Sequence, residues 1–107
     1  MKITFVGGGV MGEAIIRGVL ARKLAAPEDI VASDIVAERL SGLARQYGIR
    51  TSQDNRAAIN GSDVIVLAVK PQDSKATMAD MYGALHPDQL VLSIIAGTTV
   101  ATISRGL

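Results

Sequence analysis

Short apolar runs alternate along this chain with longer segments whose apolar residues recur at helical spacing. The short runs are rich in branched aliphatic residues, which favour strands. They predict strands over residues 2–6, 30–33, 49–51, 63–69 and 90–94. Helical spacing predicts helices over residues 10–22, 36–47, 55–59 and 71–85, and a last one that opens at Thr98 or Thr99.

This alternation predicts an α/β fold, a doubly wound and mainly parallel sheet of the Rossmann-like kind. We expect five or more strands with helices on both faces. Residues 63–69 are apolar throughout after Asp63, as is typical of a central parallel strand. The first and fourth strands should be neighbours at the switch point, where such sheets bind ligands. The loops after Val6 and Val69 are therefore the candidate binding loops.

Helical spacing also predicts which face of each helix meets the sheet. In the second helix, Leu40, Leu43 and Tyr47 share one face. The predicted apolar stripe of the first helix consists of Met11, Ala14, Ile15, Gly18, Val19 and Arg22.

A glycine-rich turn follows the first strand and leads directly into the first helix. Its sequence is Gly7, Gly8, Gly9, Val10, Met11, Gly12. This matches the G-x-G-x-x-G pattern, in which the first glycine allows the tight turn, the second admits a pyrophosphate and the third lets helix and strand pack closely. We expect Gly8 to be merely permissive. A purely structural turn is the alternative, and the missing Lys-Ser or Lys-Thr argues against a nucleoside triphosphate loop.

The end of the second strand bears on the choice of cofactor. Asp34 lies 22 positions beyond Gly12, where an acidic side chain binds the adenine ribose and favours NAD(H). Ser33 as a phosphate donor, together with Arg39, would instead accommodate the 2′-phosphate of NADP(H). The structural alternative is that Asp34 caps the second helix.

The loop after the fourth strand reads Ala68, Val69, Lys70, Pro71. Because proline biases the preceding residue toward an extended backbone, we expect Lys70 to be held in place. Its ammonium group would then contact a ribose, a phosphate or an anionic substrate. An ordinary solvent-exposed lysine is the alternative.

Composition narrows the classes of function. The 107 residues suit a single domain, 49% of them are hydrophobic, and the formal net charge is +1. These values favour a soluble globular protein that binds neither nucleic acid nor membrane. The chain has no cysteine, and His86 is its single histidine, so we expect no metal site. The absence of cysteine also fits a reducing compartment, and we expect a cytoplasmic location. No residue stands out as catalytic.

Beyond these patterns, the chain resembles the N-terminal domain of pyrroline-5-carboxylate reductases over nearly its whole length. The resemblance is carried by ITFVGGGVMGEAIIRGVL, DVIVLAVKPQD and LVLSIIAGTTVATI, by Ser33-Asp34 and by Asn55. It implies an NAD(P)H-dependent oxidoreductase of proline biosynthesis that reduces the C=N bond of 1-pyrroline-5-carboxylate to give L-proline. The cofactor is NADP(H) or NAD(H).

The resemblance also implies a set of cofactor-binding positions. The turn holds the pyrophosphate, Ser33 lies at the ribose or its phosphate, and the loop at Lys70 leads to the nicotinamide. Together with Gly12, Asp34 and Arg39, which the sequence patterns above single out, the candidate cofactor-binding residues are Val6, Gly7, Gly8, Gly9, Val10, Met11, Gly12, Ser33, Asp34, Arg39, Asn55, Ala68, Val69, Lys70, Pro71, Ile95, Ala96 and Gly97.

Members of that family continue into a helical domain that dimerises and completes the substrate pocket. We therefore expect residues 1–107 to be the cofactor-binding domain of a homo-oligomeric enzyme, inactive without the further domain. Two alternatives stay open. One is a stand-alone NAD(P)-binding or redox-sensing module, and the other is a domain of a β-hydroxyacid dehydrogenase or of an F420-dependent NADP reductase.

Overall fold

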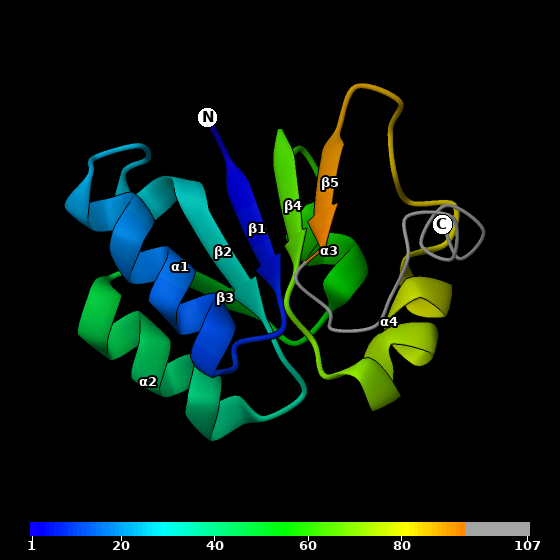
Figure 1. Cartoon of the computed structure of the whole chain (residues 1–107), viewed down its shortest axis with the longest axis horizontal. Coiled ribbons are helices and arrows are strands. Elements are labelled where there is room, and N and C mark those ends of the chain that lie inside the picture. Colours follow the sequence, from blue (N-terminus) through cyan, green and yellow to red (C-terminus); the bar gives the residue numbers. More distant parts are fainter. Residues whose placement is uncertain (94–107) are drawn as a thin grey trace.

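A single parallel sheet forms the centre of the computed structural model, which describes residues 1–93. Its five strands lie in the order β3-β2-β1-β4-β5 (Figure 1). Their bounds are β1 Ile3–Val6, β2 Ile30–Ser33, β3 Arg50–Ser52, β4 Val64–Leu67 and β5 Leu90–Ser93. In the register, Ile3 lies opposite both Ile30 and Val64. The predicted sheet and the pairing of the first strand with the fourth are thus confirmed.

Four α-helices connect the strands. Their bounds are α1 Val10–Ala21, α2 Ala37–Tyr47, α3 Asn55–Ile59 and α4 Ser74–Met81. Two short 3-10 helices, Pro27–Asp29 and Pro71–Asp73, precede β2 and α4. Figure 1 shows α1 and α2 side by side over the β1–β2–β3 half of the sheet. The α3 helix contacts β1, β2 and β3 as well as α4.

Two apolar clusters occupy the two faces of the sheet, because successive side chains of a strand point to opposite sides. Phe5 packs with Ile16 of α1 and Leu43 of α2. Val6, the next residue, packs instead with Ile59 of α3 and Met81 of α4. The helices therefore cover both faces, as the doubly wound fold requires.

The predicted faces of the helices are right for α2 and partly wrong for α1. In α2, Leu40 and Leu43 are buried and Tyr47 packs against them. In α1 the buried residues are Gly12 and Ile16, and the predicted stripe residue Met11 is 61% exposed. Ala14, Gly18 and Arg22 are exposed too, whereas Ile15 and Val19 pack on the core as predicted.

This difference in α1 follows from the close approach of Gly12 to the turn, which sets the rotation of the helix. A Cβ atom at Gly12 would lie only 2.9 Å from the carbonyl oxygen of Gly7. The helix contains two adjoining apolar stripes, and this contact brings the one through Gly12 and Ile16 onto the sheet.

Some predicted boundaries also move. Residues 63–69 were expected as a strand, but β4 ends at Leu67, because the backbone of the neighbouring strand β1 turns away at Gly7. The third strand lies one residue later than expected. The helix expected to end near residue 85 ends at Met81, because Gly83 has φ +81° and cannot continue the helix. The helix expected at Thr98 or Thr99 lies outside the described residues.

Candidate functional site

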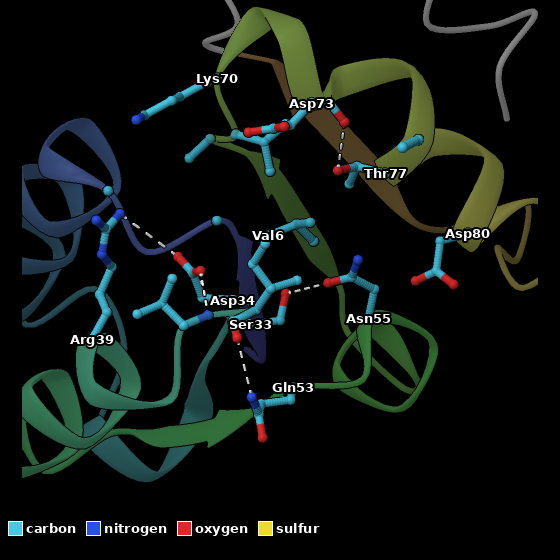
Figure 2. A pocket seen from close by; sticks show the side chains of 17 residues that line it. Val6, Ser33, Asp34, Arg39, Gln53, Asn55, Lys70, Asp73, Thr77 and Asp80 are labelled. Carbon is cyan, nitrogen blue, oxygen red and sulfur yellow. Dashed lines mark hydrogen bonds and ion pairs between the residues drawn. The ribbon is translucent and has the colours of Figure 1, made fainter.

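A cavity of about 550 Å³ opens at the carboxyl ends of β1, β2 and β4 (Figure 2). It is the location that the switch-point rule predicts for a ligand in a doubly wound sheet. The predicted site residues that line it are Val6, Gly7, Gly9, Ser33, Asp34, Arg39, Asn55, Ala68, Val69 and Lys70.

Other predicted residues lie elsewhere. Gly8, Val10, Met11, Gly12 and Pro71 do not line the cavity, although Gly8, Val10 and Pro71 directly adjoin lining residues in the chain. Ile95, Ala96 and Gly97 lie outside the described residues.

Sequence reasoning missed part of the lining. The missed residues are Ile35, Val36, Gln53, Asp73, Ala76, Thr77 and Asp80. Gln53 directly follows β3, so the strand-end rule applied to every strand would have found it. No sequence signal shows which face of α4 meets the cavity.

The glycine turn is wedged between the ends of two other strands. Gly7 has φ +100°, and a Cβ atom there would lie 2.8 Å from the backbone carbon of Ala68. Its N–H donates to the carbonyl oxygen of Ser33 at 2.8 Å. A side chain at position 7 would therefore clash with backbone and demand an unfavourable conformation.

Gly9 differs from Gly7, because the protein itself leaves room for a side chain there. A Cβ atom at Gly9 would meet nothing closer than the Arg39 guanidinium, at 3.6 Å. Gly9 is also the N-cap of α1 and gives the helix no side-chain cap. The first turn of α1 thus leaves its N–H groups to an outside acceptor, and an anionic group suits that position.

Gly8 is more constrained than the sequence suggested. A Cβ atom there would lie 3.0 Å from Leu43 Cδ1, and the Gly8 N–H donates to Asp34 Oδ2 at 2.9 Å. Its expected role as a merely permissive residue is wrong, because it both packs on α2 and binds the Asp34 carboxylate.

The Asp34 carboxylate faces inward and joins two backbone segments. Besides the bond from Gly8, its Oδ1 accepts from the Val36 N–H at 3.0 Å. Arg39 Nη1 lies 3.8 Å from Asp34 Oδ2. The alternative of Asp34 as a cap of α2 is wrong, since the N-cap is Val36 and no side chain caps this helix.

Ser33, the last residue of β2, directly precedes Asp34 and is fully buried. Its hydroxyl donates to Asn55 Oδ1 at 2.7 Å (Figure 2). Asn55 is the first residue of α3, whose N-cap Asp54 accepts from the N–H groups of Arg56 and Ala57. The Ser33 hydroxyl thus holds the side chain of Asn55, and its donation to a phosphate stays a prediction.

Lys70 has the extended backbone that the following proline predicted, with φ −66° and ψ 150°. Its side chain is exposed and makes no ion pair with the residues that the structure describes. Figure 2 shows it extending from the β4–α4 loop toward the side on which Arg39 lies. Arg39 and Lys70 are the cationic residues among those that line the cavity.

A second side of the cavity, the α4 wall, consists of Lys70, Asp73, Ala76, Thr77 and Asp80. Its polar side chains make few contacts. The Thr77 hydroxyl donates to the Asp73 carbonyl oxygen at 2.9 Å, and Asp80 lies farther along the same helix (Figure 2). Within residues 1–93, no cluster of three or more histidine, cysteine or acidic residues is arranged to hold a metal ion. None of the helices in this part has the length and apolar character needed to cross a membrane.

The comparisons with known proteins agree with this geometry. The model of a family described as NADP oxidoreductase, coenzyme F420-dependent, matches residues 2–97. A pyrroline-5-carboxylate reductase of Methanosarcina acetivorans is 37% identical over 106 residues, which are 99% of this chain and 39% of that protein.

Two solved structures extend the comparison. A pyrroline-5-carboxylate reductase from Coxiella burnetii matches with a TM-score of 0.93 and 34% identity, over 99% of this chain and 39% of that one. The Plasmodium falciparum pyrroline carboxylate reductase with NADP bound matches with a TM-score of 0.83 over 98% of this chain and 37% of that one. Its identity of 21% makes it a match of fold. This chain thus spans well under half the length of each of these three proteins.

Proposed function

The chain belongs to the family of coenzyme F420-dependent NADP oxidoreductases, and on that premise we propose that it is the cofactor-binding part of a pyrroline-5-carboxylate reductase. Such an enzyme reduces 1-pyrroline-5-carboxylate to L-proline with NADPH or NADH. The observation that carries the proposal is the 37% identity to the M. acetivorans reductase over 99% of this chain.

The residues of the cavity fit a dinucleotide. Gly9 leaves the backbone at the start of α1 open, although a Cβ atom would fit there within the protein. The uncapped N–H groups and the positive end of the α1 dipole would bind the pyrophosphate. Gly7 and Gly12 allow the close backbone contacts that hold these N–H groups in place, because a Cβ atom at either position would clash with backbone.

The rest of the cavity would orient the two ends of the cofactor. Ile35 and Val36 offer apolar surface beside Arg39, while Lys70 lies on the β4–α4 loop. When bound, the reduced nicotinamide supplies a hydride to the C=N carbon of the substrate. The name of the family and the NADP in the P. falciparum structure support NADP(H) as the cofactor.

The proposal assigns substrate binding to residues beyond the shared part, since the M. acetivorans relative is more than twice as long as the matched region. We propose that a helical domain of the whole enzyme completes the substrate pocket and the contacts of a homo-oligomer. The substrate is a small molecule, and we propose a cytoplasmic location.

Calorimetric titration of the 107-residue chain with NADPH and NADH, together with an assay for proline formation, tests these statements. We expect binding of a reduced cofactor and no proline from the chain alone. Negligible binding of both cofactors would overturn the cofactor assignment. Steady-state proline formation by the 107 residues would overturn the need for a further domain.

A second candidate function follows from the name of the matched family, which includes coenzyme F420. The enzyme would then transfer a hydride between NADP(H) and a deazaflavin. Supplying the whole enzyme with NADPH and either 1-pyrroline-5-carboxylate or oxidised F420 distinguishes the two. We expect turnover with the imine, and turnover with F420 alone would replace the first proposal.

A further inference from the structure

We propose that Asp34 positions the glycine turn, and that Arg39 makes the protein prefer NADPH to NADH. This inference rests on the proposed function and deepens it. It reverses the expectation from the sequence, in which Asp34 would bind the ribose and favour NADH.

Both carboxylate oxygens of Asp34 accept hydrogen bonds from backbone N–H groups. Oδ2 accepts the N–H of Gly8 at 2.9 Å, and Oδ1 accepts the N–H of Val36 at 3.0 Å. Both are hydrogen bonds to a charged acceptor, which are stronger than neutral ones. The side chain is only 12% exposed. The carboxylate is therefore turned toward the backbone and fastens the glycine turn to the loop that leads into α2.

A 2′-phosphate near Asp34 would meet the charges of both Asp34 and Arg39. A bare carboxylate at the end of β2 would repel the phosphate of NADPH. Here the Arg39 guanidinium lies 3.8 Å from Asp34 Oδ2, so its positive charge offsets the negative one. Arg39 thus weakens the repulsion that Asp34 would otherwise exert on the 2′-phosphate of NADPH.

The Arg39 guanidinium keeps hydrogen-bond donors for a ligand. Its contact with Asp34 is longer than a hydrogen bond, and its side chain is 43% exposed. The same Nη1 atom lies near Gly9, where an added Cβ atom would be 3.6 Å away. A guanidinium in this state has N–H groups left for a phosphate, whose geometry it matches with paired hydrogen bonds.

The test compares the Arg39→Gln and Asp34→Asn variants with the unchanged protein, by calorimetric titration with NADPH and with NADH. Arg39→Gln should weaken NADPH binding about 10- to 100-fold, because a charge-assisted contact is lost, and change NADH binding less than about twofold. Arg45→Gln is the matched control, since Arg45 lies in the last turn of α2 and outside the cavity. It should change neither affinity.

Asp34→Asn should weaken both cofactors by about the same factor, roughly tenfold, because the amide offers a single acceptor oxygen for two N–H groups. Amide hydrogen exchange measured by NMR should accelerate at Gly8 and Val36 relative to the core strands. A merely global loss of stability would not produce this local pattern.

Each result bears on the inference. A loss of NADH binding alone in Asp34→Asn would overturn it, because Asp34 would then bind the ribose. An equal loss of both cofactors in Arg39→Gln would overturn it as well, as would unchanged exchange at Gly8 and Val36 in Asp34→Asn. If the unchanged protein binds neither cofactor, it is the proposed function that fails.

Discussion

The two walls of the cavity are built in different ways. On the glycine wall, which is formed by the turn of residues 7–12, backbone groups are hydrogen-bonded or in close contact. The Gly7 N–H donates to Ser33 and the Gly8 N–H donates to Asp34. Gly12 lies so close to the Gly7 carbonyl oxygen that a Cβ atom would not fit. On the α4 wall, Lys70 and Asp80 are exposed side chains. The first wall has a shape that backbone contacts impose, whereas the second offers charges on movable side chains. Substitutions in the first should therefore change folding and binding together, and those in the second should change binding alone.

The largest effect is expected from a methyl group on the glycine wall. Gly12→Ala places a Cβ atom 2.9 Å from the Gly7 carbonyl oxygen. Backbone must move to relieve this contact, so we expect a loss of about 3 kcal/mol in the free energy of unfolding, at the upper end for overpacked sites. NADPH affinity should fall at least about tenfold, because the turn shifts with it. Urea unfolding followed by circular dichroism, and calorimetric titration, measure the two effects.

Gly18→Ala is the control in the same helix, because a Cβ atom at Gly18 meets nothing within 4 Å. Alanine should stabilise the helix there by about 0.5 to 1 kcal/mol and leave NADPH binding unchanged. Equal effects of the two substitutions would show that the contact at Gly12 does not matter and would remove the contrast between the walls.

A smaller effect is expected on the α4 wall. Lys70→Gln removes an exposed charge that lines the cavity, so NADPH affinity should fall about 3- to 10-fold while the free energy of unfolding stays within about 0.5 kcal/mol. The difference should shrink as salt is added, because an exposed charge is screened. Lys75→Gln is the control, since Lys75 is exposed on α4 outside the cavity. A large loss of stability in Lys70→Gln would contradict the distinction between the walls.

The same contrast explains what could be predicted from the sequence. The short run of branched residues predicted β2 with its observed bounds, and helical spacing did the same for α3, because turn signals adjoin each of them. The roles of Gly7 and Gly12 were also predictable, since they depend on a local pattern of spacing.

What failed depends on contacts between distant segments. Asp34 binds Gly8, which is 26 positions away, and no spacing rule shows that its carboxylate turns inward. The lining residues of α4 were missed for a similar reason, since the face that meets the cavity is set by packing on Met78 and Met81. In α1 the predicted apolar stripe was partly wrong, because the close approach of Gly12 to the Gly7 carbonyl oxygen sets the rotation of the helix.

The smallest effect is expected behind the glycine wall, where α2 ends against α1. The Tyr47 hydroxyl is buried without a hydrogen-bond partner among the described residues. This burial, together with the Glu13 carboxylate nearby, raises the pKa of Tyr47 above its ordinary value of 10.0. Since a buried hydroxyl without a partner loses its hydrogen bonds to water on folding, Tyr47→Phe should not lower the free energy of unfolding at pH 7.

The pH dependence gives Tyr47→Phe a sharper readout. The unfolded chain releases the Tyr47 proton near pH 10, whereas the folded protein keeps it to higher pH, so stability falls as the pH rises above about 10. Urea unfolding at pH 7 and pH 10.5 should show a smaller fall in Tyr47→Phe than in the unchanged protein. Tyr82→Phe is the control, because Tyr82 is 66% exposed, and it should keep the full fall. If Tyr47→Phe instead lost NADPH binding at pH 7, the packing at the end of α2 would also affect the binding site. The backbone contacts that shape the site would then extend beyond the glycine turn.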